Sequence, residues 1–286
     1  MSNHTQPAST TAEPAVPPDH DRGLEFDVRT LLARRSALGM LSGAGLLALV
    51  GCTDGSSGAV STTRSATAAV TASATAADTV VPDETAGPYP GDGSNGVDVL
   101  DDSGIVRQDI SSSFGTSTTT AAGVPLTLNL TVLDSSSGYS AMAGVAVYAW
   151  HADAQGRYSM YSQGVEDENY LRGVQPTNPA GTATFTTVFP GCYDGRWPHI
   201  HFEVYRSTAE ATSDGQIVRT SQVALPQAAC DAVYADGATY VSSAANLTRT
   251  SLTRDMVFGD DGGIHQLASV TGDVTSGYVA NLTIAI

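Results

Sequence analysis

The sequence of 286 residues has no lysine, few cysteines and no long apolar run. Its 13 basic residues are all arginines and stand against 29 acidic residues, which gives a formal net charge of −16. Phosphate backbones repel so acidic a chain, so we expect no nucleic-acid partner. No apolar run reaches the roughly 18 residues of a membrane-spanning helix, which argues against a polytopic membrane protein. The 3 cysteines form neither a disulfide-rich scaffold nor a Cys-x-x-Cys metal pair.

The amino-terminal segment, residues 1–51, has the pattern of an export signal. Arg34 and Arg35 precede an apolar stretch that runs to Val50, and a twin arginine in this place indicates the bacterial Tat route. The stretch ends in Leu49-Val50-Gly51-Cys52, which resembles the lipobox of bacterial lipoproteins and would make Cys52 the lipid-bearing first residue of the mature chain. We therefore expect an exported protein, lipid-anchored outside the membrane or secreted. A buried helix, or an ordinary signal with an unrelated cysteine, is the alternative.

Residues 52–79 are rich in Ser, Thr, Ala and Gly and contain almost no charged or large apolar residues. Such a segment buries too little apolar surface to offset the entropy lost on ordering. We interpret it as a flexible tether between the anchor and a globular domain at residues 80–286.

Period-2 alternation in residues 80–286 predicts β-strands. Leu126, Leu128, Leu130 and Val132 alternate with Thr and Asn, as expected for a strand with one buried face. Further alternating or short apolar runs occur at 145–150, 183–187, 200–204 and 282–286. Helical periodicity is nearly absent, and the best candidate is 226–234, where Pro226 would suit the first helical position. The pattern predicts an all-β domain, an antiparallel β-sandwich.

Two histidines at positions 199 and 201 indicate a metal site. On a strand, the side chains of His199 and His201 point to the same face, while Ile200 and Phe202 point to the other. Two imidazoles on one face can converge on a metal ion. The motif alone is weak, because a surface pair of histidines has the same spacing.

The surrounding motifs resemble those of the intradiol ring-cleavage dioxygenases, the family of catechol and protocatechuate dioxygenases. The likeness runs from about Glu84 to at least Gln222. It is carried by Gly156-Arg157-Tyr158, by Pro190-Gly191-Cys192-Tyr193 and by Arg196-Trp197-Pro198-His199-Ile200-His201. The resemblance implies that Tyr158, Tyr193, His199 and His201 hold ferric iron. Independently of the family, phenolate oxygen suits a hard trivalent cation better than thiolate does, and such a cation takes the proton from a phenol.

The resemblance also implies an activity. A catechol would bind to the iron as a dianion and displace one tyrosinate, which accepts a substrate proton, and dioxygen would cleave the ring to a cis,cis-muconate-type diacid. Tyr193 and Arg196 would be catalytic, since the family places an arginine here to stabilise negative charge on the substrate. Thr85, Gly87, Pro88 and Gln222 match segments beside the substrate pocket.

Cys192 and Cys230 are the thiols that remain once Cys52 is assigned to lipid. In an exported protein we expect them to form a disulfide, and two buried free thiols are the alternative. The amino-terminal helical domain that builds the dimer of catechol dioxygenases has no counterpart here, so the oligomeric state stays open.

Two other functions compete with the dioxygenase. One is a non-catalytic lipoprotein that binds aromatic ligands in the same pocket, and the other is a copper or zinc module built on His199 and His201. Neither needs two phenols and a cation, so Tyr158, Tyr193 and Arg196 favour the enzyme.

Overall fold

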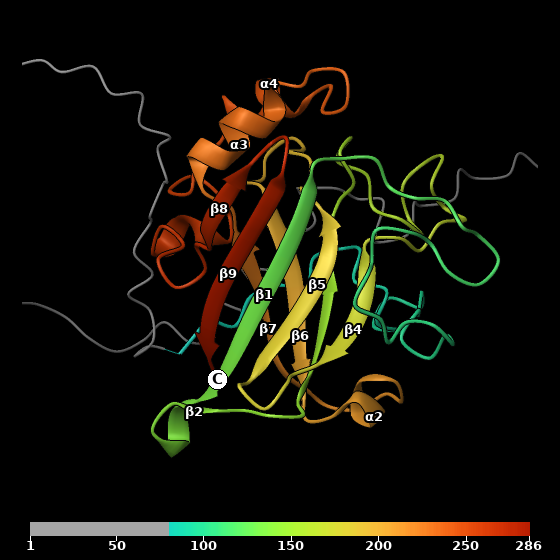
Figure 1. Ribbon diagram of the computed structural model, residues 1–286, viewed down its shortest axis with the longest axis vertical. Helices are drawn as coiled ribbons and strands as arrows, with labels where there is room; N and C mark the ends of the chain where they lie inside the picture. Colours follow the sequence, from blue (N-terminus) through green and yellow to red (C-terminus); the bar gives the residue numbers. More distant parts are fainter. Residues whose placement is uncertain (1–79) are drawn as a thin grey trace, which may run out of the picture.

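A computed structural model describes residues 80–286, which form two β-sheets packed face to face (Figure 1). The first sheet has the strand order β2-β1-β9-β8, and β5 also pairs with β1. The second sheet has the order β4-β3-β6-β7. The strands of the first sheet are β1 (Pro125–Asp134), β2 (Ser140–Ala141), β5 (Thr182–Val188), β8 (Ser269–Asp273) and β9 (Gly277–Ala285). Those of the second sheet are β3 (Ala146–Trp150), β4 (Arg172–Pro176), β6 (His199–Tyr205) and β7 (Ile217–Ala224).

The core between the sheets forms from the predicted alternating residues. Leu126, Leu128, Leu130 and Val132 of β1 are buried in one cluster together with residues of β6 such as Ile200, Phe202 and Val204. Burying each such side chain stabilises a fold by about 1.5–3 kcal/mol. The alternation therefore identified the inward faces correctly, and the β-sandwich prediction is confirmed.

One strand pair departs from the antiparallel prediction. β1 and β9 run parallel, with Leu126 opposite Tyr278 and Leu133 opposite Ala285, while all pairs of the second sheet are antiparallel. Alternation predicts which side chains face the core, and it is the same for both strand directions. The direction depends on the long connection that brings the last strand beside the first, which the local pattern does not contain.

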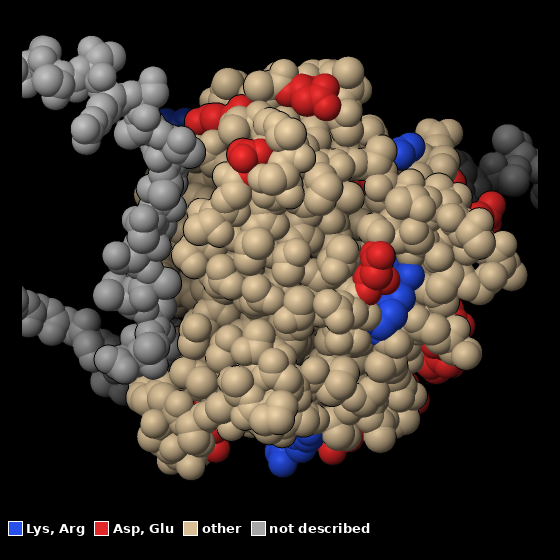
Figure 2. Space-filling view, viewed as in Figure 1, with Lys and Arg blue, Asp and Glu red and all other residues tan. Residues whose placement is uncertain are grey.

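The outer face of the first sheet carries hydroxyl and amide side chains. Figure 2 shows this face as a broad area with few charged residues. Asn129 of β1 donates to Asn281 of β9 over 2.9 Å and accepts from Thr184 of β5 over 2.8 Å. These side chains bond across the strands, so the solvent-facing half of the alternation is polar and almost free of charge on a strongly acidic chain.

The helices are short and lie at the ends of the sandwich (Figure 1). They are α2 (Thr208–Ala211), α3 (Gln227–Tyr234) and α4 (Ser243–Leu247), with single 3-10 turns η2 (Ser135–Ser137) and η3 (Phe258–Asp260). The predicted helix at 226–234 is α3, although Pro226 precedes it with extended backbone, ψ 142°, and so is not its first helical residue. No helix in residues 80–286 has the length and apolar character that crossing a membrane requires. The predicted signal, the lipid-bearing Cys52 and the tether lie outside the described residues.

Candidate functional site

The residues predicted to bind a metal meet at one end of β6. His199 and His201 lie on this strand, which pairs with β3 on one side and with β7 on the other. Tyr158 lies in the loop after β3, and Tyr193 lies in the loop that joins β5 to β6. Both loops leave the sandwich beside the start of β6, so the topology brings together four residues from three separate segments.

Two glycines let the tyrosine loops pack against each other. A Cβ at Gly191 would lie 2.7 Å from the carbonyl oxygen of Asp153, to which the Gly191 N–H already donates over 3.0 Å. Gly156 has φ +82°, and a Cβ there would lie 2.9 Å from the Cβ of Tyr193. A larger residue at either place would push the loops apart. The close approach of the two loops thus explains the glycine in the Gly-x-Tyr motif and in the Pro-Gly-x-Tyr motif.

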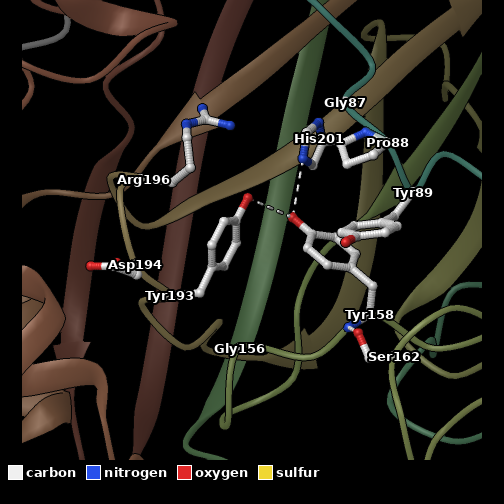
Figure 3. Close-up of a pocket in the computed structure, with 10 residues that line it drawn as sticks. All are labelled: Gly87, Pro88, Tyr89, Gly156, Tyr158, Ser162, Tyr193, Asp194, Arg196 and His201. Carbon is white, nitrogen blue, oxygen red and sulfur yellow. Dashed lines mark hydrogen bonds between the residues drawn. The ribbon is translucent and has the colours of Figure 1, made fainter. Parts of the chain in front are cut away.

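The oxygen and nitrogen atoms of the four side chains form a tight cluster. The hydroxyl oxygen of Tyr158 lies 3.4 Å from that of Tyr193, 3.4 Å from Nε2 of His199 and 3.1 Å from Nε2 of His201. The Tyr193 oxygen lies 3.2 Å from His199 Nε2, and the two Nε2 atoms are 3.0 Å apart. Figure 3 shows the Tyr158 oxygen between Tyr193 and His201. All four predicted ligands therefore converge.

The surroundings orient both imidazole rings. Nδ1 of His199 lies 2.5 Å from the carbonyl oxygen of Trp197, to which it donates, so its Nε2 presents a lone pair to the cluster. His201 stacks on Trp150 with ring centroids 4.9 Å apart. A carbonyl that holds the far ring nitrogen is the usual partner of a metal-binding histidine.

Burial governs the pKa values of these groups. It lowers the pKa of His199 to about 3, helped by the nearby Arg196 charge, and it lowers the pKa of His201 well below its usual value, helped by His199. Burial, followed by the neighbouring Tyr193, raises the pKa of Tyr158 well above its usual value. Both imidazoles are therefore neutral, as metal ligands must be, while the Tyr158 phenol needs a cation beside it to ionise.

The donor atoms fit a metal ion. Bonds of about 2.0–2.1 Å to four ligands place neighbouring ligand atoms roughly 2.9–3.5 Å apart. The five distances within the cluster, 3.0 to 3.4 Å, lie in this range. No group of three or more His, Cys, Asp or Glu side chains in residues 80–286 could hold a metal ion. A metal here would depend on tyrosine oxygens, which select a hard cation such as Fe(3+).

Arg196 lies beside the cluster and is held from two sides. Its Nε donates to Oδ2 of Asp255 over 3.0 Å, and its Nη2 donates to Oε1 of Gln222 over 2.6 Å. Arg196 is 6% exposed and Asp255 is 2% exposed. Burial lowers the pKa of Arg196, but the neighbouring Tyr193 and Asp255 raise it and outweigh burial, so the guanidinium is cationic.

A cavity of about 200 Å³ opens beside the cluster. Drug-sized ligand pockets typically hold roughly 300–1,000 Å³, so this one suits a single small ring. Four of the predicted ligands or catalytic groups, Tyr158, Tyr193, Arg196 and His201, line it together with a wall of loop residues. The lining residues are Gly87, Pro88, Tyr89, Gly156, Tyr158, Ser162, Tyr193, Asp194, Arg196 and His201.

Two predicted substrate-binding residues line the cavity and two support it. Gly87 and Pro88 are in the wall, and a Cβ on Gly87 would lie 3.3 Å from Cε1 of His201. Oγ1 of Thr85 accepts from the Gly87 N–H over 3.0 Å, and its carbonyl accepts from Nε2 of Gln222 over 3.0 Å. Neither Thr85 nor Gln222 lines the cavity, so they act through Gly87 and Arg196.

The predicted disulfide is absent, and this corrects the sequence analysis. Cys192 and Cys230 are buried free thiols. Burial raises the pKa of Cys192 to about 12, and burial together with the nearby Cys192 raises that of Cys230 well above its usual value. Export alone had suggested the bond, and the sequence contains no information about the distance between the two sulfur atoms.

Sequence reasoning missed Tyr89, Trp150 and Asp255. The Tyr89 ring lies 5.1 Å from the Tyr158 ring and forms a wall of the cavity. Trp150 was assigned to a strand, but its place opposite His201 follows only from the register of β3 and β6. Asp255 lies 59 positions from Arg196 in a loop that carries no motif.

Comparisons with known proteins find similar folds among solved structures. The intradiol ring-cleavage dioxygenase from Tetranychus urticae is similar over 73% of this chain and 94% of its own, with 23% identity and a TM-score of 0.58. The chain has the intradiol dioxygenase fold. A second dioxygenase, Tetur07g02040, gives a TM-score of 0.57 at 23% identity, over 73% of this chain and 94% of its own.

The dioxygenase domain of a dioxygenase and carbohydrate-binding fusion from Streptomyces sp. SirexAA-E gives a TM-score of 0.45 at 22% identity, over 72% of this chain and 96% of its own. No family model and no curated protein matches the sequence. The intradiol dioxygenase fold accounts for the sandwich, and the chemistry rests on the side chains described above.

Proposed function

We propose that this protein is a non-haem ferric dioxygenase that cleaves catechol-type diols between their hydroxylated carbons. The observation that carries the proposal is the cluster of two phenol oxygens and two imidazole nitrogens 3.0–3.4 Å apart. Tyr158, Tyr193, His199 and His201 would hold Fe(3+). When bound, the ion supplies a Lewis acid that ionises the phenols and withdraws electron density from a bound catechol.

The chain's own residues would prepare the substrate. Tyr193, half-buried and in the cavity wall, is placed to take a proton from an incoming hydroxyl once its own phenol is ionised. Arg196 presents a fixed positive charge where the ring gains negative charge, and fixed charges in a site with little water are often the largest catalytic contribution. Catechol and one dioxygen would give cis,cis-muconic acid, with both oxygen atoms retained in the product.

The walls limit the substrate to a small aromatic diol. Tyr89 and Pro88 offer apolar surface on the side of the cavity opposite Tyr193 in Figure 3. Exclusion of water by this surface strengthens the electrostatic interaction between Arg196 and the ring.

We also propose that the protein is exported through the Tat route and anchored by a lipid at Cys52, so that it takes up O2 and the diol outside the membrane. The sequence of residues 1–51 supports it. Cell fractionation of wild type and Cys52→Ala is the measurement. The variant should leave the membrane fraction, and unchanged membrane association would contradict the anchor.

The decisive experiment uses the purified full chain loaded with Fe(3+). We expect about one iron per chain, a red to burgundy charge-transfer colour from tyrosinate, and oxygen uptake with one or more of catechol, hydroxyquinol and protocatechuate. A coloured protein without oxygen uptake would favour the alternative function, a non-catalytic protein that binds aromatic ligands. A colourless, fully metal-loaded protein would contradict the phenolate site itself.

A further inference from the structure

Asp255 is a buried carboxylate in the loop between α4 and η3. Its Oδ2 accepts from Nε of Arg196 over 3.0 Å and from the N–H of Trp197 over 2.6 Å. Its Oδ1 accepts from the N–H groups of Val257 and Phe258 over 2.8 and 3.2 Å. The two oxygens therefore have different partners. Oδ1 holds its own loop, and Oδ2 holds the segment that leads to His199.

The guanidinium of Arg196 is fixed by this carboxylate and by one amide. Asp255 holds its Nε edge, and Gln222 accepts from Nη2 on another edge. A planar guanidinium held along two edges has no rotational freedom left. Arg196 lines the cavity and Asp255 does not, so the carboxylate lies behind the arginine, away from any ligand.

We propose that Asp255 is the positioning residue for Arg196, which it locks in the orientation that faces the ring in the cavity. The proposal rests on the proposed function and adds a residue to it. Among the described residues no hydrogen bond joins Asp255 to a metal ligand, and Arg196 is the one side chain that donates to it, so it acts through the arginine. A free arginine side chain would lose rotamer entropy each time it engaged a substrate, and Asp255 removes that cost in advance.

Asp255→Asn tests the role because it changes one oxygen only. The remaining amide oxygen can still accept from Val257 and Phe258, while the amide NH2 would face two N–H donors, Nε of Arg196 and the Trp197 N–H. We expect kcat to fall about 10- to 100-fold with KM within about threefold, which is the size of effect that misplacing one catalytic group produces. Iron content and the tyrosinate band should stay unchanged.

The partner variant is Arg196→Gln, which should lower kcat about 100- to 1,000-fold. If Asp255 acts only through the arginine, the double variant should be no slower than Arg196→Gln alone. Additive losses in the double variant would overturn the proposal, as would a kcat of Asp255→Asn within twofold of wild type. Loss of iron from Asp255→Asn would also overturn it, because the residue would then support the ligands.

A matched control is Asp273→Asn. Asp273 is the exposed last residue of β8 and accepts from two backbone N–H groups, Thr275 and Ser276, both over 2.8 Å. Its substitution should leave kcat within twofold. If Asp255→Asn fails to fold because it leaves Arg196 buried and unpaired, the double variant should fold again with the activity of Arg196→Gln. A double variant that also fails to fold would assign Asp255 a purely structural role and overturn the proposal.

The same variants separate this inference from the proposed function. Wild-type protein that takes up iron but shows no oxygen uptake refutes the dioxygenase. An active wild type with an unaffected Asp255→Asn variant refutes only the positioning role. Anaerobic titration with catechol gives a second readout, because a misplaced arginine should shift the absorption band of the catechol complex while the band of the unliganded protein stays the same.

Discussion

The metal-free protein should lose stability on mild acidification, because three of its histidines are buried in the neutral form. Burial lowers the pKa of His151 to about 4, that of His199 to about 3 and that of His201 well below its usual value. Between the unfolded pKa of about 6.5 and these folded values, the unfolded chain binds protons that the folded chain does not. The three neutral histidines therefore contribute their full stabilisation of the folded state above the unfolded pKa of about 6.5, and this contribution is lost as the pH falls below it.

The size of the effect follows from the unfolded pKa. Lowering the pH from 7 to 5 should cost ~2 kcal/mol for each histidine that stays neutral in the folded chain, or ~6 kcal/mol for three. Glu203 acts in the opposite direction, because burial, followed by the charge of Asp92, raises its pKa to about 8. The folded chain binds a proton on Glu203 that the unfolded chain lacks, and this stabilises the folded state by ~3 kcal/mol over the same pH range. The expected net loss is ~3 kcal/mol.

Urea denaturation of the chelator-treated chain at pH 7 and pH 5 measures this loss. His151 isolates one contribution without touching the metal ligands, since its ring bonds to the Ala152 carbonyl and the Thr187 hydroxyl. His151→Phe should be less stable at both pH values, yet its loss between them should be smaller than that of wild type by ~2 kcal/mol. Glu203→Gln should lose more stability than wild type between pH 7 and pH 5, because it lacks the opposing effect of Glu203. An equal pH dependence in wild type and His151→Phe would refute the reasoning.

Further predictions concern the metal and the cavity. Tyr193→Phe should lose the tyrosinate colour of that ligand and lower kcat at least 100-fold, measured by absorbance and oxygen uptake; full activity would contradict its role. Gly87→Ala places a Cβ 3.3 Å from His201 at φ +74° and should raise KM for catechol several-fold, whereas Gly115→Ala, at φ +76° with open space around it, has the same backbone strain of about 1–2 kcal/mol and should leave KM unchanged. Asp194→Asn removes an exposed negative charge from the cavity wall and should raise kcat/KM for a carboxylated catechol about two- to fivefold at low salt, but not for catechol; equal effects on both substrates would contradict the charge argument.

Local patterns predicted most of the sandwich because one face of each strand is buried. The alternation at Leu126–Val132 and the His199/His201 pair both depend only on the period of a strand, which local sequence determines. The parallel placement of β9 beside β1 depends on a connection across the whole domain. The burial of β3 on both faces likewise depends on what packs against it, which the alternation of its own residues does not specify.

The candidate site likewise has residues that local sequence predicts and residues that only the fold brings into place. Tyr158 and Tyr193 were found because short motifs with glycines position them, and those glycines are needed where two loops touch, while Arg196 was found from its spacing to His199 and His201. Asp255 belongs to no motif and reaches Arg196 only through the fold. Gln222 was identified, but its role was not, because its two hydrogen bonds lead to Arg196 and Thr85 and not into the cavity.

The charges around Tyr158 explain why a metal must precede ionisation. Arg196 and Arg172 both favour the phenolate, while burial and the neighbouring Tyr193 oppose it. Arg172 is fully buried and donates to the carbonyls of Tyr89, Pro90 and Ser159. Burial outweighs both arginines, so the Tyr158 phenol stays protonated without a further cation. Binding of Fe(3+) to this cluster should therefore release about two protons per ion, one from each phenol, and the colour should develop in step with that release.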